Sequence, residues 1–127
     1  MVPTGRTFLI ADGDEEVRAV EREALNHIDG VEIVGEAATG PDAVVMAEAL
    51  QPDVVLIGAR MPFLNGVEAI PAIRGRAPDS RIVVVTPPGV GVLERMARKL
   101  GARVTSSHSP RGLAEELEAA LEDRRPE

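Results

Sequence analysis

The sequence has no cysteine, tryptophan or tyrosine, and only two phenylalanines among its 127 residues. Without cysteine there is no disulfide, no thiolate nucleophile and no cysteine-based zinc site. The scarcity of aromatic rings also removes the platforms on which single-stranded nucleic acids stack their bases. A core must therefore be built from Val, Leu, Ile and Ala, and a hydrophobic content of 44% is enough to form one.

Positive charge is also in short supply, because the net charge is -7. Binding to duplex DNA needs a basic patch, so we expect no direct nucleic-acid binding by this segment. No apolar run approaches the ~18 residues of a membrane span. The N-terminal stretch MVPTGRTFLIADGDEE becomes acidic too early for a signal peptide. We expect a cytoplasmic location, no membrane contact and a single domain over residues 1–127.

Short apolar runs alternate with segments of helical periodicity along the whole chain. The pattern predicts strands at 7–11, 31–37, 53–59, 81–86 and 103–107, and helices at 14–28, 39–50, 65–75, 91–101 and 109–123. This (βα)5 order is typical of an α/β fold with a parallel sheet covered by helices on both faces. Pro71 falls inside the third helical segment, where proline costs ~3 kcal/mol, so we expect a kink or a short helix there.

Ligands of such folds bind beyond the carboxyl ends of the strands. The residues that follow the apolar runs are therefore the candidates for a functional site: 11–14, 58–61, 86–87 and 106–108.

These strand-end residues carry a family resemblance. FLIADGDEEVR, PDVVLIGARMPFLNGVEAI, RIVVVT and KLGA follow one another at family spacing, and over residues 6–122 the chain resembles the receiver domain of bacterial response regulators, CheY-like and of the NarL/LuxR type. The resemblance implies a flavodoxin-like, doubly wound sheet of five strands in the order 2-1-3-4-5. It also implies that residues 123–127 are a tail or the start of a linker to a C-terminal DNA-binding domain outside this chain.

Receiver domains of this family transfer a phosphoryl group to an aspartate at the end of the third strand. An acidic pair after the first strand holds Mg²⁺, and a Thr or Ser and a Lys bind the phosphoryl oxygens. By resemblance, Gly58 occupies the acceptor position and has no side chain to phosphorylate. Asp12 is the retained member of the acidic pair, whereas Gly13 replaces the acid that would contact the metal.

Of the remaining site positions, some match the residue typical of the family and others do not. Thr86 matches the hydroxyl position, and Thr105 stands where the family often has a Tyr or Phe that changes rotamer on activation. The lysine position falls on His108, or on Ser106 if the fifth strand is shorter. Asp53 cannot replace the acceptor, because five residues of strand place it about 16 Å from Gly58 at the other end of the sheet.

Each of these residues also has a structural interpretation. Asp12 and Asp14 are suited to capping the first helix, Thr86 to a turn, His108 to a solvated loop and Gly58 to a close backbone approach. Asp12 and Asp14 are the only candidate metal ligands, and two carboxylates bind a hard cation weakly without phosphate oxygens. We therefore expect no Mg²⁺ and no other cofactor.

The combination indicates a pseudo-receiver that is not an enzyme. We expect a signalling module that regulates transcription through protein contact and homodimerisation by exposed helical surfaces, without aspartate phosphorylation. The alternative is a receiver in which a small molecule replaces the phosphoryl group as the signal. It would bind the cleft formed by Asp12, Gly13, Gly58, Thr86 and His108.

Overall fold

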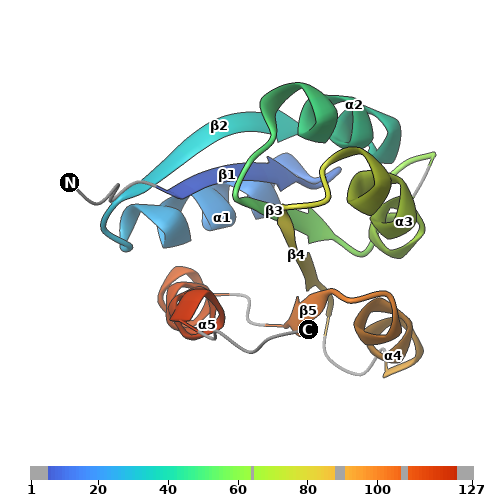
Figure 1. Cartoon of the computed structure of the whole chain (residues 1–127). Helices are drawn as coiled ribbons and strands as arrows, with labels where there is room; N and C mark the ends of the chain where they lie inside the picture. The colour runs from blue at the N-terminus through green and yellow to red at the C-terminus, as the bar shows by residue number, and fades with distance from the viewer. Residues whose placement is uncertain (1–5, 64, 88–90, 107–108, 123–127) are drawn as a thin grey trace.

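Five strands and five helices alternate along the chain in the computed structural model, which describes residues 6–63, 65–87, 91–106 and 109–122 (Figure 1). The strands are β1 (Arg6–Ala11), β2 (Val31–Ala37), β3 (Val54–Gly58), β4 (Arg81–Val85) and β5 (Arg103–Thr105). The helices are α1 (Glu15–Asn26), α2 (Gly40–Leu50), α3 (Gly66–Arg76), α4 (Gly91–Lys99) and α5 (Pro110–Glu122). Within these ranges no helix is long and apolar enough to cross a membrane.

All five strands are parallel, in the order β2-β1-β3-β4-β5, which confirms the predicted topology. Every residue of the central strand β3 is buried. Helices α1 and α5 cover one face of the sheet, and α2, α3 and α4 cover the other (Figure 1). The uninterrupted apolar run of β3 follows from this burial on both faces.

The predicted helix starts are confirmed by their caps. Asp14 accepts a hydrogen bond from the backbone N–H of Glu16 at 2.8 Å. Thr39 accepts one from Asp42 N–H at 3.2 Å, and Ser109 accepts one from Gly112 N–H at 3.0 Å. These bonds satisfy backbone donors that have no partner inside the helix.

Two local predictions can be compared with the structure. Helix α3 is 11 residues long and runs through Pro71, so the proline does not end the helix. The proline removes one backbone donor, but the Asn65–Glu68 capping box and four buried apolar side chains hold the helix: Val67, Ala69, Ile70 and Ile73. The fifth strand ends at Thr105, two residues before the predicted end at residue 107, which lies outside the described residues.

Glu21 is an acidic side chain buried in the core side of α1. It is 1% exposed, and neither carboxyl oxygen has a hydrogen-bond partner among the described residues. Helical spacing places it beside Ala24 and Leu25, which are also buried, whereas Val17, one turn earlier, is only half-buried. Burial, followed by the charge of the Asp12 carboxylate, raises the pKa of Glu21 to about 9.

We predict that Glu21→Gln stabilises the domain at neutral pH. The folded-state pKa of about 9 lies above the ordinary value of 4.5, so the contribution of Glu21 to stability is fully present below pH 4.5 and is lost as the pH rises towards 9. The loss is about 1.4 kcal/mol per pH unit, or about 3 kcal/mol at pH 7. Urea unfolding at pH 5, 7 and 8.5 measures it. Glu23→Gln, on the exposed side of α1, is the control, and equal pH slopes for wild type and Glu21→Gln would contradict the prediction.

Candidate functional site

The carboxyl ends of the central strands β1, β3 and β4 lie side by side at the C-terminal end of the sheet. Ala11 of β1 is level with Ile57 of β3, and Gly58 is level with Val85 of β4. The next residues on β1 and β4, Asp12 and Thr86, therefore flank Gly58 from either side. Both are buried, with exposed fractions of 8% and 2%. The parallel register thus brings together three of the predicted site residues.

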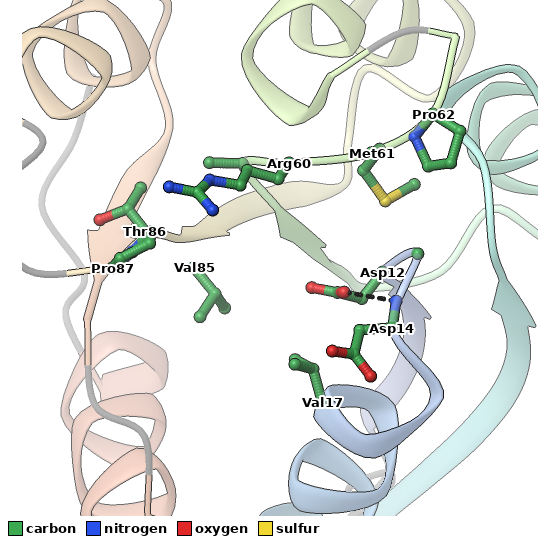
Figure 2. A pocket seen from close by; sticks show the side chains of 11 residues that line it. Asp12, Asp14, Val17, Arg60, Met61, Pro62, Val85, Thr86 and Pro87 are labelled. Atoms are coloured by element: carbon green, nitrogen blue, oxygen red, sulfur yellow. Dashed lines mark hydrogen bonds between the residues drawn. The ribbon is translucent and has the colours of Figure 1, made fainter.

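A cavity of about 510 Å³ opens above this edge (Figure 2). Its walls come from the loop after β1, the loop after β3 and the end of β4. The lining residues are Asp12, Gly13, Asp14, Val17, Ala59, Arg60, Met61, Pro62, Val85, Thr86 and Pro87. Sequence reasoning missed Val17, Pro62 and Val85. None of them has a chemical signature, because each contributes only apolar surface.

The carboxylate of Asp12 is held by its own loop. Its Oδ1 accepts a hydrogen bond from Asp14 N–H at 2.9 Å, drawn as the dashed line in Figure 2. Its backbone carbonyl accepts a bond from the Arg18 guanidinium at 2.6 Å. Burial raises the pKa of Asp12 above its usual value, and the neighbouring Asp14 carboxylate acts in the same direction. Asp12 therefore sits in a partly desolvated position with a fixed orientation.

The other carboxyl oxygen of Asp12 occupies the space beside Gly58. A Cβ built on Gly58 would lie 2.1 Å from Asp12 Oδ2 and 2.9 Å from its Cγ. Both distances are shorter than any real contact of a Cβ, so a side chain at position 58 requires Asp12 to move. Gly58 does not line the cavity, because the carboxylate of Asp12 occupies the space next to it.

Gly13 does not enlarge the cavity either. A Cβ on Gly13 would lie 2.9 Å from Pro62 Cδ, so proline from the loop after β3 closes over this position. Neighbouring side chains thus take the space beside both glycines, although Gly13 still borders the cavity and Gly58 does not.

The start of α3 presses directly against the end of β3. A Cβ on Gly66 would lie 2.1 Å from the carbonyl oxygen of Gly58, and Gly66 N–H donates to Ala59 O at 3.1 Å. Only glycine permits this backbone approach. It holds the start of α3 against the end of β3.

Thr105 takes no part in the cavity. Its hydroxyl donates a short hydrogen bond to Glu116 of α5, and it lines a separate hollow with Arg98 and Arg103. Ser106, the alternative lysine position, is exposed. His108 lies outside the described residues.

The carboxylates at this edge do not fit a magnesium site. Asp12 Oδ1 and Asp14 Oδ1 each accept a backbone N–H, and Gly13 supplies no ligand. No group of three or more His, Asp or Glu side chains in the described part of the chain could hold a metal. Mg²⁺ prefers an octahedral set of oxygen ligands, which these two carboxylates alone do not provide.

Asp53 lies at the opposite edge of the sheet, as predicted. Its carboxylate accepts hydrogen bonds from the backbone N–H of Thr7 at 2.8 Å and from the Thr7 hydroxyl at 3.2 Å. Asp53 N–H donates back to that hydroxyl at 2.9 Å. These bonds join the starts of β3 and β1, so Asp53 has a structural role away from the cavity.

Comparison with known proteins identifies the family. Residues 8–106 match the family model described as the response regulator receiver domain. The chain is 38% identical over 78 residues to the response regulator GacA of Pseudomonas aeruginosa and 41% identical over 78 residues to the response regulator UvrY of Escherichia coli. It is 32% identical over 78 residues to the nitrate/nitrite response regulator protein NarL of E. coli. Each match covers 61% of this chain and 36% of the relative.

Solved structures agree with the fold. The response regulator domain of CheB from Thermotoga maritima superposes with a TM-score of 0.81 at 28% identity, over 92% of this chain and 93% of that one. A two-component response regulator of the LuxR family from Aurantimonas superposes with a TM-score of 0.85 at 27% identity, over 95% and 88%.

We predict that Gly58→Ala destabilises the domain by about 1–2 kcal/mol, because the new methyl group displaces the Asp12 carboxylate from its bond to Asp14. In an Asp12→Ala background the same substitution should cost about 1 kcal/mol less, since the Cβ of residue 12 lies 3.6 Å from the new methyl group. Chemical denaturation of the four proteins measures this coupling. Additive effects would show that the two positions do not share the space.

Proposed function

Because this chain belongs to the response regulator receiver domain family of two-component signalling, we propose that it is a receiver that signals through protein contact without phosphorylation of an aspartate. The main observation behind this proposal is that Gly58 has no side chain. The space into which a side chain at position 58 would extend is occupied by the carboxylate of Asp12. The domain is a signalling module, and its proposed activity is binding rather than catalysis.

Three features support the absence of phosphoryl transfer. Position 58 supplies no nucleophile, and the space next to it is filled. Asp12 and Asp14 each accept a backbone N–H and Gly13 adds no third carboxylate, which supports the proposal that no bound metal offsets the charge of a transferred phosphoryl group. Asp53, whose carboxylate is bound to Thr7, is at the far edge of the sheet.

The proposed context is a longer, cytoplasmic transcription regulator. The matched region spans about a third of the curated relatives, and one of these is described as an uncharacterized transcriptional regulatory protein of Bacillus subtilis, YhcZ. We infer a C-terminal DNA-binding domain beyond this chain and a homodimer formed through exposed helical surface. The fixed loops around Asp12 and Gly66 favour a domain that presents the same surface at all times.

Acetyl phosphate with Mg²⁺ tests the proposal. We expect intact-mass spectrometry to show no added phosphoryl group, and sedimentation velocity to show the same oligomeric state before and after treatment. Gly58→Asp should also remain unmodified, because its carboxylate competes with Asp12 for space and lacks the metal-binding acid.

A receiver domain with the usual acceptor aspartate serves as the positive control for the reagent. Stable acyl-phosphate on any residue of the wild-type domain would disprove the proposal, as would an oligomeric state that depends on acetyl phosphate.

A second candidate function is the binding of a small molecule in the 510 Å³ cavity. The observation that favours it is the composition of the walls. A guanidinium from Arg60, a buried hydroxyl from Thr86 and the Asp12 carboxylate border a mostly apolar surface (Figure 2). Few polar groups on an apolar wall are typical of ligand sites. Occupancy would then replace the phosphoryl group as the signal.

Thermal shift with a library of bacterial metabolites tests this second function. A ligand at about a hundred times its Kd adds about 2.7 kcal/mol to the free energy of unfolding, so Tm should rise clearly. The rise should be smaller for Arg60→Gln and Thr86→Val than for wild type, and unchanged for Arg111→Gln on the exposed side of α5. If no metabolite raises Tm in a manner that depends on Arg60 or Thr86, the cavity is not a ligand site.

A further inference from the structure

A second hollow lies at the end of the sheet opposite to the 510 Å³ cavity, where β4 and β5 begin. We call it the amino-end hollow. The end of α3, the loop between α3 and β4, the end of α4 and the first residues of β4 and β5 border it. Its volume is about 550 Å³, which is within the range of small-molecule sites.

The lining of the amino-end hollow is basic. It contains four arginines, Arg74, Arg81, Arg98 and Arg103, and one acid, Asp79. The hollow thus has an excess of three positive charges, although the chain as a whole has a net charge of -7. A concave surface lined by charges of one sign raises the local concentration of ligands of the opposite sign. The charge of the lining therefore favours an anion.

Arg74 has donors that the protein does not use. It forms no hydrogen bond and no ion pair within the described part of the chain. Its guanidinium lies against Gly101, because a Cβ on Gly101 would be 3.0 Å from Arg74 Nη1 and 3.1 Å from its Cζ. Gly101 has a φ of +92°, so glycine both permits the turn after α4 and leaves room for the guanidinium.

Two of the other arginines also keep most of their charge available. Arg81 Nη1 donates to the backbone carbonyls of Ala120 and Leu121 at 3.2 and 3.3 Å, and these acceptors have no net charge. Arg98 pairs with Glu94 at 2.9 Å, but the two side chains are 56% and 44% exposed. Exposed pairs of this kind are weak, so an anion with several charges can compete for Arg98.

The helix ends at the hollow do not explain the arginines. Cations near the C-terminus of a helix often bind its last carbonyl groups. At the end of α4, however, Ala97 O accepts a hydrogen bond from Ala102 N–H at 3.0 Å. At the end of α3, Ile73 O accepts one from Ala77 N–H at 2.7 Å. The backbone closes both helices, and the guanidinium of Arg74 is not needed for this purpose.

We propose that the amino-end hollow binds the diphosphate or triphosphate group of a small molecule. A guanidinium has a planar set of donors that fits two oxygens of one phosphate. Because Arg74 belongs to α3 and Arg98 to α4, the two can bind successive phosphates of one chain. The described residues that line the hollow include no aromatic ring for a nucleobase, so the phosphates provide the recognition.

This inference goes beyond the proposed function and does not depend on it. The amino-end hollow is at the other end of the sheet from Gly58 and Asp12, and it shares no lining residue with the 510 Å³ cavity. Either site can be occupied or removed without a direct effect on the other.

Isothermal titration calorimetry with inorganic triphosphate, in low salt and without Mg²⁺, tests the site. We expect saturable binding of one ligand per domain, and weaker binding as NaCl is added, because the contact is between charges. Arg74→Gln should weaken binding about tenfold through the loss of charge-assisted hydrogen bonds. Asp79→Asn should strengthen it about threefold, since a repulsive charge is removed.

Matched variants separate this site from a general attraction of anions. Arg60→Gln at the carboxyl ends of the strands and Arg111→Gln on the exposed side of α5 remove the same charge elsewhere and should leave the affinity unchanged. Arg74 has no bond to lose, so Arg74→Gln should keep the wild-type Tm without ligand.

Inorganic diphosphate and ADP, titrated separately, distinguish two sources of the phosphate chain. Equal or weaker binding of ADP would assign the site to an inorganic phosphate chain. Tighter binding of ADP would assign it to a nucleotide.

Three results would overturn the proposal. One is the absence of saturable binding by inorganic diphosphate, inorganic triphosphate and ADP. Another is an affinity that Arg74→Gln and Arg60→Gln lower equally. The third is tighter binding of duplex DNA than of triphosphate through Arg74, which would make this end of the domain a nucleic-acid surface. Acetyl phosphate takes no part in these titrations, so the amino-end hollow and the phosphorylation-independent function can fail separately.

Discussion

Strand β3 is buried on both faces and hydrogen-bonded on both edges, and the remaining elements are arranged around it. Burial of every residue from Val54 to Gly58 requires helices above and below the sheet. Since the strands are parallel, all their carboxyl ends meet at one edge. The close packing of Gly66 on the carbonyl of Gly58 then fixes the loop that follows β3. The position of the site therefore follows from the parallel strands and from the packing of α3 against the end of β3.

At the carboxyl ends of β1 and β3, the Asp12 carboxylate lies beside Gly58, which has no side chain. Asp12, retained at the end of β1, places an oxygen in the space that a side chain on residue 58 would need. Its partial desolvation raises its pKa, and the Asp12 carboxylate in turn helps burial to raise the pKa of Glu21 on α1. A site that stabilises the negative charge of a phosphoryl group needs cations close to Asp12 and Gly58. This arrangement is the basis for proposing that the domain signals without phosphorylation of an aspartate.

Charged residues are distributed unevenly among the helices of the domain. Acidic residues dominate the helices α1 and α5, whereas α4 and its neighbours are basic. An uneven field of this kind steers partners of opposite charge to one face and disfavours contact between like faces. With Thr105 bonded to Glu116, the hollow between β5 and α5 is also bridged by a direct contact.

The sequence alone determined the (βα)5 order, the strand order through its family resemblance, the helix caps and the set of strand-end residues, because these depend on local periodicity and capping chemistry. It also placed Asp53 at the wrong edge for chemistry, since distance along a strand is fixed. Continuity through Pro71 was decided by tertiary packing, which offset a local penalty. The burial of Glu21 was visible in the helical spacing but contradicts the usual exposure of acids. Only the tertiary structure showed that Asp12 fills the place beside Gly58 and that Pro62 closes over Gly13, because those contacts join loops that are distant in the chain.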